Sequence, residues 1–307
     1  MSTQHATSRG TYHPLLGTNV EVRVIARAAT VPAAYALAEV AETVAVNRIV
    51  HLQSVFTTYE ASSELCRWRA AEIDEVSPEL TEVLRAAEHW WRVSGGAFHP
   101  VTERLRGRWL RAETDGVPPS AAELAHLVVQ LAALPFTVTD AGVQRVGDCT
   151  GLDLNAIAKG YIVDQAAEAA AAQPGVVDVL VNAGGDLRHI GDQSLRVGVE
   201  DPRQPGGAPL QVVEVGEGAL ATSGPVHRGF RVGRHWYGHV LDPRTGRPVA
   251  GRPSTTVRAP DAMTADALAT VAGVLDWPTA AAIVSASPAA GCLVVDESGE
   301  VLTCGAW

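Results

Sequence analysis

From residue 152 to residue 161 the chain reads Leu152-Asp153-Leu154-Asn155-Ala156-Ile157-Ala158-Lys159-Gly160-Tyr161. This stretch predicts a short strand, a turn and the start of a long helix, because Ala is the best helix former and no Pro occurs between Ala156 and Ala172. Four residues of the helix recur at helical spacing and form an apolar stripe: Val163, Ala166, Ala167 and Ala170.

Lys159 occupies an unusual place in this helix. It lies on the apolar stripe, one turn before Val163, and near the positive end of the helix dipole. An anion bound at the start of the helix would stabilise a cation there. A lysine whose ammonium extends to the surface would give the same pattern. Both interpretations stay open on this stretch alone.

The rest of the chain mixes helical and strand patterns, which predicts an α/β (α+β) fold of mixed strands flanked by helices. Residues 1–12 are expected to be a flexible arm, and 13–307 a single large domain with two intimate subdomains, because no linker-like stretch divides them. Helices are predicted over 32–52, 78–93, 120–131, 156–172, 263–274 and 278–284. Strands are predicted over 18–26, 176–181, 195–199, 210–215, 229–232, 235–240 and 255–258, with a hairpin over 291–303.

Composition excludes several classes of protein. The 307 residues are 47% hydrophobic and 19% charged, which is ordinary for a globular enzyme, and the net charge of -10 offers no broad basic surface for nucleic acid. None of the four cysteines is in CxxC spacing, which favours free thiols in a reducing compartment. No secretory signal and no run of membrane-spanning length is visible, so the sequence predicts a cytoplasmic protein without a transmembrane segment.

A second informative stretch contains Asp266 and Thr270, one helical turn apart and opposite the apolar face of their helix. A carboxylate and a hydroxyl at this spacing can share one hard cation, Mg²⁺ or Ca²⁺. A solvated helix face gives the same pattern and is the more frequent explanation. The Ala-rich surroundings, without Lys, Glu or Arg, argue against a solvated face.

Two further segments could carry chemistry. His239 is predicted at a strand end beside the tight turn 242–246, where it could be a general base or a structural histidine. Gly184 and Gly185 could let a ligand approach the backbone closely, or could simply make a turn. The chain has no GxxxxGK[ST] loop, no GxGxxG after a strand and no GxSxG, which argues against ordinary NTPases, Rossmann enzymes and α/β-hydrolases.

An ordered set of short motifs resembles the FAD:protein FMN transferase (ApbE-type) family over about residues 14–305. The matching segments are Leu16-Gly17-Thr18, Ser63-Glu64-Leu65, Gly95-Gly96-Ala97-Phe98-His99-Pro100, 153–161, 181–186, 221–224, 239–246 and 261–270. Each segment alone is a weak signal, whereas the set in this order is specific.

The resemblance implies an enzyme that binds FAD with Mg²⁺ and moves FMN onto a Thr or Ser hydroxyl of an acceptor flavoprotein, releasing AMP. By position, it implies Mg²⁺ ligands at Asp266, Thr270 and the Ala156 carbonyl, and a base at His239. It implies FAD contacts from Leu16, Tyr59, His99, Lys159 and Val240.

The sequence departs from the family pattern around the nucleotide. His99 stands where the family has Asp, Leu16 where it has Met, and Arg69 where it has Asn. We therefore expect FAD binding to be altered more readily than the chemistry. Two alternatives stay open: a pyrophosphatase that splits FAD to FMN and AMP, and a non-catalytic FAD-binding protein. The family is often exported or membrane-anchored, although no export signal is visible here.

Overall fold

An antiparallel sheet of eight strands runs through the protein, in the order β1-β2-β5-β6-β9-β14-β15-β16. The computed structural model describes residues 3–140, 142–224, 229–251 and 253–307. The strands of the sheet are β1 (Gln4–Leu15), β2 (Thr18–Ala28), β5 (Val176–Ala183), β6 (Asp186–Gly191), β9 (Gly218–Ser223), β14 (Ser254–Ala259), β15 (Gly291–Val295) and β16 (Val301–Gly305).

Smaller pairs of strands surround this sheet. They are β3 (Phe136–Thr139) with β4 (Gly142–Arg145), β7 (Leu195–Val199) with β8 (Gln211–Val215), β10 (Gly229–Val232) with β11 (His235–Gly238), and β12 (Leu241–Asp242) with β13 (Arg247–Pro248). The helices are α1 (Val31–Phe56), α2 (Glu64–Arg69), α3 (Pro78–Val93), α4 (Glu103–Asp115), α5 (Ala121–Val129), α6 (Ala158–Ala171), α7 (Ala262–Val274) and α8 (Trp277–Ala286).

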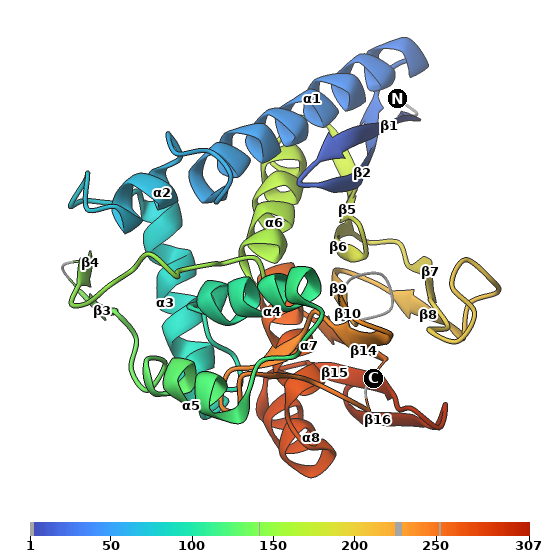
Figure 1. Ribbon diagram of the computed structural model, residues 1–307. Helices are drawn as coiled ribbons and strands as arrows, with labels where there is room; N and C mark the ends of the chain where they lie inside the picture. Colours follow the sequence, from blue (N-terminus) through green and yellow to red (C-terminus); the bar gives the residue numbers. More distant parts are fainter. Residues whose placement is uncertain (1–2, 141, 225–228, 252) are drawn as a thin grey trace.

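Helices cover one face of the sheet, and the β7–β8 pair lies on the other. Successive helices α1, α6, α7 and α8 contact one another and lie over successive strands from β1 to β16. The two faces can be told apart within β15, where Cys292 and Val294 join the main core and Leu293 and Val295 join a small cluster beside Val199 of β7. Helices α2 to α5 gather beside this layer, toward the left of Figure 1. This arrangement confirms the predicted fold of strands flanked by helices.

Most helices begin where their capping residues predict. Ser77 accepts the N–H of Leu80 at the start of α3, and Ser120 forms a reciprocal capping box with Glu123 at the start of α5. The predicted stripe of α6 is fully buried, since its four members have no exposed surface: Val163, Ala166, Ala167 and Ala170. No helix among the described residues is long and apolar enough to cross a membrane.

The expected flexible arm is instead a strand, so that prediction is wrong for residues 4–12; residues 1 and 2 lie outside the described part. β1 pairs with β2 from Gln4 to Leu15. The sequence of β1 is polar and does not predict a strand, because the buried part of β1 contacts a carboxylate of α1 rather than an apolar surface. The Ser8 and Tyr12 hydroxyls both donate to Glu42, with 2.5 Å between Tyr12 Oη and Glu42 Oε1.

Other elements also differ from the predictions, each for its own reason. Residues 152–154 form no strand; they lie in an irregular segment in which the Asp153 N–H donates to the Pro100 carbonyl at 2.7 Å. Helix α4 was not predicted because it is rich in charged residues and buries only Leu105, Trp109 and Ala112. Strand β9 is missing from the predicted strands because it lies in the middle of the sheet and its first four residues are all buried, which removes the alternation of polar and apolar residues.

Helices α6 and α7 cross in close contact at Gly160. A Cβ atom on Gly160 would lie 2.2 Å from the Ala262 carbonyl oxygen, closer than real Cβ atoms come to other atoms. Only glycine therefore lets the two helices approach this closely. Both helices carry predicted site residues near this crossing, so their separation sets the geometry of the candidate site.

We expect Gly160→Ala to lower the free energy of unfolding by about 1–3 kcal/mol, the usual cost of overpacking. The same change at Gly107, in α4, is the matched control, since a Cβ there meets no atom within 4 Å. Gly107→Ala should stabilise the protein by up to about 1 kcal/mol through helix propensity. Urea unfolding of the two variants would contradict the close α6–α7 contact if Gly160→Ala were as stable as Gly107→Ala.

Candidate active site

Lys159 is the second residue of α6, and its ammonium binds a carboxylate from the sheet. Lys159 Nζ lies 2.8 Å from Oδ2 of Asp186, the first residue of β6, whose side chain is 1% exposed. The Lys159 side chain itself is 30% exposed. The chain therefore supplies an anion to this cation, and part of the Lys159 side chain stays accessible at the start of α6.

The turn before Asp186 packs against a second motif from the N-terminal hairpin. Gly184 has φ of +61°, and a Cβ there would lie 2.3 Å from Thr18 Oγ1. Gly185 has φ of +101° and open space where a Cβ would project. Both glycines are required by positive φ. Gly184 is also required by close packing, whereas Gly185 leaves backbone accessible beside Asp186.

Leu16 lies in the tight turn of this hairpin, between β1 and β2. Leu16 and Gly17 both have positive φ, 54° and 68°, which is typical of a type I′ turn. The Leu16 N–H donates to Gln53 Oε1 of α1 at 2.8 Å, so α1 helps to hold a conformation that leucine rarely adopts. The hairpin places Leu16 near the turn that carries Asp186.

Asp266 of α7 points into the crossing with α6 and is 8% exposed. Its Oδ2 accepts the N–H of Gly160 at 3.2 Å. A solvated helix face is therefore the wrong interpretation for Asp266. Burial, and then the Asp186 carboxylate, raise the pKa of Asp266 well above its ordinary value, while Lys159 and the Gly160 N–H act in the opposite direction. Asp186 and Asp266 thus place two buried carboxylates near a single lysine.

The residues around Asp266 fit a divalent cation of the Mg²⁺ type. Thr270 lies one turn further along α7 and is partly exposed, and Ala156 precedes the start of α6. In a regular helix the Gly160 N–H would donate to the Ala156 carbonyl, four residues earlier. Here it donates to Asp266 instead. A carboxylate, a hydroxyl and a carbonyl are hard oxygen ligands, and a cation would offset the charge of Asp186 and Asp266.

The donor set leaves coordination positions for other ligands. Within the described ranges, no three or more His, Cys, Asp or Glu residues are grouped to hold a metal. Mg²⁺ commonly binds through one or two carboxylates and completes its shell with water and substrate phosphates. The arrangement would therefore suit an ion that completes its shell with water and phosphate oxygens better than a structural metal.

Asp164 is a buried carboxylate that the sequence analysis did not single out. It lies on α6 and accepts the N–H groups of Ala262 and Met263 at 2.7 and 2.8 Å, which caps the first turn of α7 from a neighbouring helix. Burial raises the pKa of Asp164 to about 7, although these two donors and Arg188, 3.5 Å away, favour the charged form. The sequence feature that could have indicated Asp164 is the presence of an acidic residue directly beside the apolar stripe of α6.

His99 is buried and bonded to the protein's own backbone. Its Nδ1 accepts the Val101 N–H at 3.1 Å, so Nε2 carries the proton and donates to the Leu131 carbonyl at 3.0 Å. Burial lowers the pKa of His99 to about 4, which keeps the ring neutral. A carboxylate in this position could accept from Val101 but could not donate to Leu131. The predicted contact between His99 and FAD stays a prediction.

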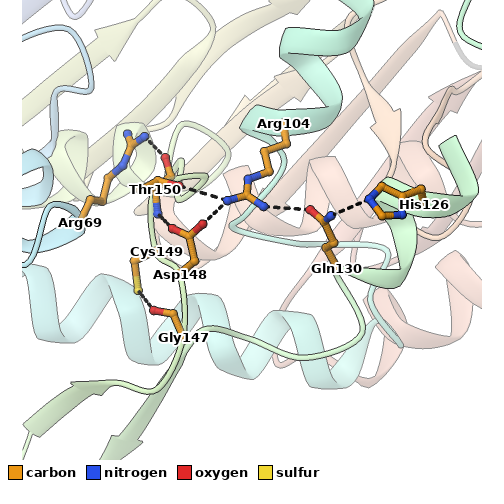
Figure 2. Close-up of polar contacts among 8 residues, drawn as sticks. All are labelled: Arg69, Arg104, His126, Gln130, Gly147, Asp148, Cys149 and Thr150. Carbon is orange, nitrogen blue, oxygen red and sulfur yellow. Dashed lines mark hydrogen bonds and ion pairs between the residues drawn. The ribbon is translucent and has the colours of Figure 1, made fainter. Parts of the chain in front are cut away.

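Arg69 and Arg104 hold the segment that leads into the 152–161 motif (Figure 2). Arg69, which stands where the resembled family has Asn, donates to the Thr150 carbonyl. Arg104 of α4 donates to Asp148, to Thr150 Oγ1 at 3.3 Å and to Gln130 at 2.8 Å. Hydrogen bonds from Thr150, together with Arg104, lower the pKa of the Asp148 carboxyl. The two arginines thus hold the loop at residues 148–150 in place.

The remaining predicted residues lie on other elements. Tyr59 is 85% exposed in the loop between α1 and α2. His239 directly follows β11 and is partly buried, and the Val240 carbonyl accepts the Val249 N–H at 2.9 Å. The structure thus brings Lys159, Asp186 and Asp266 together, while contacts of Tyr59 and His239 with a ligand stay predictions.

A cavity of about 420 Å³ adjoins the strand that leads to His239. Aromatic and proline side chains form much of its wall, with Arg247 and Glu297 as charged members. The aromatic members are Trp109, Trp236 and Tyr237. In the part of the chain that the structure describes, Lys159 and Asp266 are not among the residues that line this cavity.

A protein-family model matches most of this chain. The model of the ApbE family matches residues 16–294, which include Lys159, Asp186, His239 and Asp266. The chain belongs to the ApbE family. The family assignment rests on most of the chain and agrees with the resemblance identified from the motifs.

Curated relatives carry the name FAD:protein FMN transferase. The chain is 35% identical over 225 residues to the one from Rhodobacter capsulatus, covering 69% of this chain and 42% of that protein. It is 30% identical over 233 residues to the one from Vibrio cholerae, covering 70% of this chain and 67% of that protein. The match therefore spans under half of the first relative and about two thirds of the second.

Solved ApbE structures share the fold over nearly the whole chain. The crystal structure of the ApbE protein from Thermotoga maritima has a TM-score of 0.81 at 28% identity and covers 98% of this chain and 97% of that one. The flavin transferase ApbE from Vibrio cholerae has a TM-score of 0.77 at 22% identity, with coverage of 99% and 98%. The second likeness bears on the fold alone.

The buried neutral His99 predicts a specific pH dependence of stability. The pKa of His99 is lower in the folded than in the unfolded protein, so the unfolded chain binds more protons. The free energy of unfolding therefore decreases as the pH is lowered from about 6.5 to about 4. Between about pH 7.5 and about pH 5 the wild type should lose about 2 kcal/mol relative to His99→Asn. Denaturant unfolding at both pH values measures this. The exposed control, His126→Asn, should follow the wild-type profile, and parallel profiles for wild type and His99→Asn would contradict a neutral buried ring.

Proposed function

We propose that this ApbE protein transfers FMN from FAD to a Thr or Ser hydroxyl of an acceptor protein and releases AMP. Family membership and the names of its relatives support the reaction class. The single observation that carries the proposal to this chain is the cluster of Lys159, Asp186 and Asp266 where α6 begins and crosses α7. Such a cluster suits a pyrophosphate held with a divalent cation.

The proposed roles follow from charge and position. Lys159, at the first turn of α6, would bind pyrophosphate oxygens together with the positive end of the helix dipole. Asp266, Thr270 and the Ala156 carbonyl would hold Mg²⁺. Mg²⁺ supplies neutralisation of the phosphate charge when it is bound. Asp186 would orient Lys159 through their 2.8 Å ion pair.

The transfer itself exchanges one phosphorus–oxygen bond for another. The acceptor Oγ forms a bond to the FMN phosphorus, and the bond from that phosphorus to the bridging oxygen of AMP breaks. His239 is the proposed base that takes the proton of the acceptor hydroxyl. AMP leaves with the electron pair of the broken bond. Phosphoryl transfer of this kind needs mainly positioning, charge neutralisation and a base.

Incubation of the protein with FAD and Mg²⁺, with and without a flavoprotein carrying a Thr or Ser target, tests the function. AMP would be measured by chromatography, and the acceptor mass would report covalent FMN. We expect AMP release that depends on both Mg²⁺ and the acceptor. AMP and free FMN without acceptor would support the pyrophosphatase alternative. FAD binding without AMP release under all conditions would support a non-catalytic FAD-binding protein.

We expect Asp266→Asn to reduce Mg²⁺-dependent turnover by at least about 100-fold, because one carboxylate ligand is lost. The amide oxygen can still accept the Gly160 N–H, so the fold should persist. Asp266→Ala leaves that buried donor unsatisfied and should also cost about 1–3 kcal/mol of stability.

Asp276→Asn is the matched control, since the Asp276 carboxylate caps the start of α8, where it accepts the Thr279 N–H at 3.1 Å. It should weaken the α8 cap but leave turnover near the wild-type rate. The metal assignment would be overturned by a wild-type rate in Asp266→Asn, measured with Mg²⁺ titrated over a wide range.

A further inference from the structure

Cys292 of β15 and Cys304 of β16 lie directly opposite each other in the antiparallel ladder at one edge of the sheet. Residues in such a pair project to the same face of the sheet. Cys292 faces the helix layer, because it belongs to the main core together with its neighbour Val257 on β14. Both thiols therefore lie on the side of the sheet that α8 covers.

The hydrogen-bond pattern of the ladder sets the distance between the two cysteines. The Ala306 N–H donates to the Ala290 carbonyl, and the Asp296 N–H donates to the Glu300 carbonyl. Every second pair of an antiparallel ladder is hydrogen-bonded, so Cys292 and Cys304 form such a pair, with Cα atoms roughly 5.5 Å apart. Disulfides span Cα separations of roughly 4.4–6.8 Å and Cβ separations of roughly 3.5–4.5 Å. The Cβ atoms of a hydrogen-bonded pair lie at or beyond the upper end of that range, so closure draws the two strands slightly together.

The two thiols differ in access and in reactivity. Cys292 has no exposed surface, whereas Cys304 is partly exposed on the edge strand. Hydrogen bonds from Cys292 and from Ser285 of α8 lower the pKa of Cys304 to about 7. The outer thiol is thus the one that a small molecule can reach and that is readily deprotonated.

We propose that Cys292 and Cys304 are a dithiol site that is oxidised to a disulfide by a low-molecular-weight disulfide such as glutathione disulfide. The Cys304 thiolate attacks one sulfur of the small disulfide, and a thiolate leaves, which gives a mixed disulfide on Cys304. The Cys292 thiol then loses its proton and attacks Cys304 Sγ, which expels the second small thiolate. Two protein thiols are oxidised, one small disulfide is reduced to two thiols, and the two protons pass to these products.

The other two cysteines provide internal controls. Cys66 is partly exposed, and its Sγ lies 3.6 Å from the Thr57 carbonyl oxygen. Cys149 is buried, its Sγ lies 3.5 Å from the Pro135 carbonyl oxygen, and burial raises its pKa to about 11. Neither lies opposite a second cysteine in a strand pair of the described residues. A small disulfide should therefore leave at most a mixed disulfide on Cys66.

The full-length protein can be incubated with graded ratios of oxidised to reduced glutathione, alkylated and digested. The tryptic peptide 259–307 contains Cys292 and Cys304 and no other cysteine, because no Lys or Arg follows Arg258. We expect this peptide to lose the mass of two hydrogen atoms on oxidation. Cleavage after Glu297 and Glu300 should then leave two fragments that stay joined until they are reduced.

Single variants test the order of attack. Cys292→Ser should stop at a mixed disulfide on Cys304, and Cys304→Ser should give neither adduct nor linkage in this peptide. Cys66→Ser should behave as the wild type. Wild-type peptide 259–307 that keeps two free thiols, or that carries an adduct without closure, would overturn the proposal. The wild-type digest decides the question even if a variant does not fold.

Discussion

The contact of α6 with α7 at Gly160 is the constraint on which the candidate site depends. The absence of a Cβ brings the two backbones together, and the Gly160 N–H then reaches Asp266. Asp164 adds a second link by capping α7 from α6. Because each helix accepts backbone N–H groups from the start of the other, Lys159 and Asp266 are held close together. The sheet contributes Asp186 to the same place.

Much of this could be predicted from the sequence, since the signals were local. The buried stripe of α6, the caps at Ser77 and Ser120 and the oxygen donors of α7 all follow from periodicity and residue type. The strand β1 could not be predicted, because Ser8 and Tyr12 are buried against Glu42, which lies on another element. The pairing of Lys159 with Asp186 was equally out of reach, because only the tertiary fold shows that the anion comes from the chain itself.

The departures from the family pattern have a structural explanation that the sequence could not provide. His99 uses both ring nitrogens on backbone groups, and Arg69 holds the Thr150 carbonyl. Arg69 therefore bonds to the segment that leads into the 152–161 motif, and His99 bonds to the residue after Pro100, whose carbonyl accepts the Asp153 N–H. From the sequence alone His99 is a predicted FAD contact and Arg69 a departure from the family pattern near the nucleotide, because residue type does not show which backbone groups a side chain bonds. The structure gives each of them a role in the stability of the protein.

The two edges of the large sheet belong to the first and last strands of the chain, β1 and β16. β1 carries Arg9, Gly10 and Pro14, residues that discourage pairing with another molecule. The strand that it covers, β2, alternates Val20, Val22 and Val24, each without exposed surface. β1 therefore acts as a protective cover, because its removal would turn a valine-rich inner strand into an open edge suited to intermolecular association.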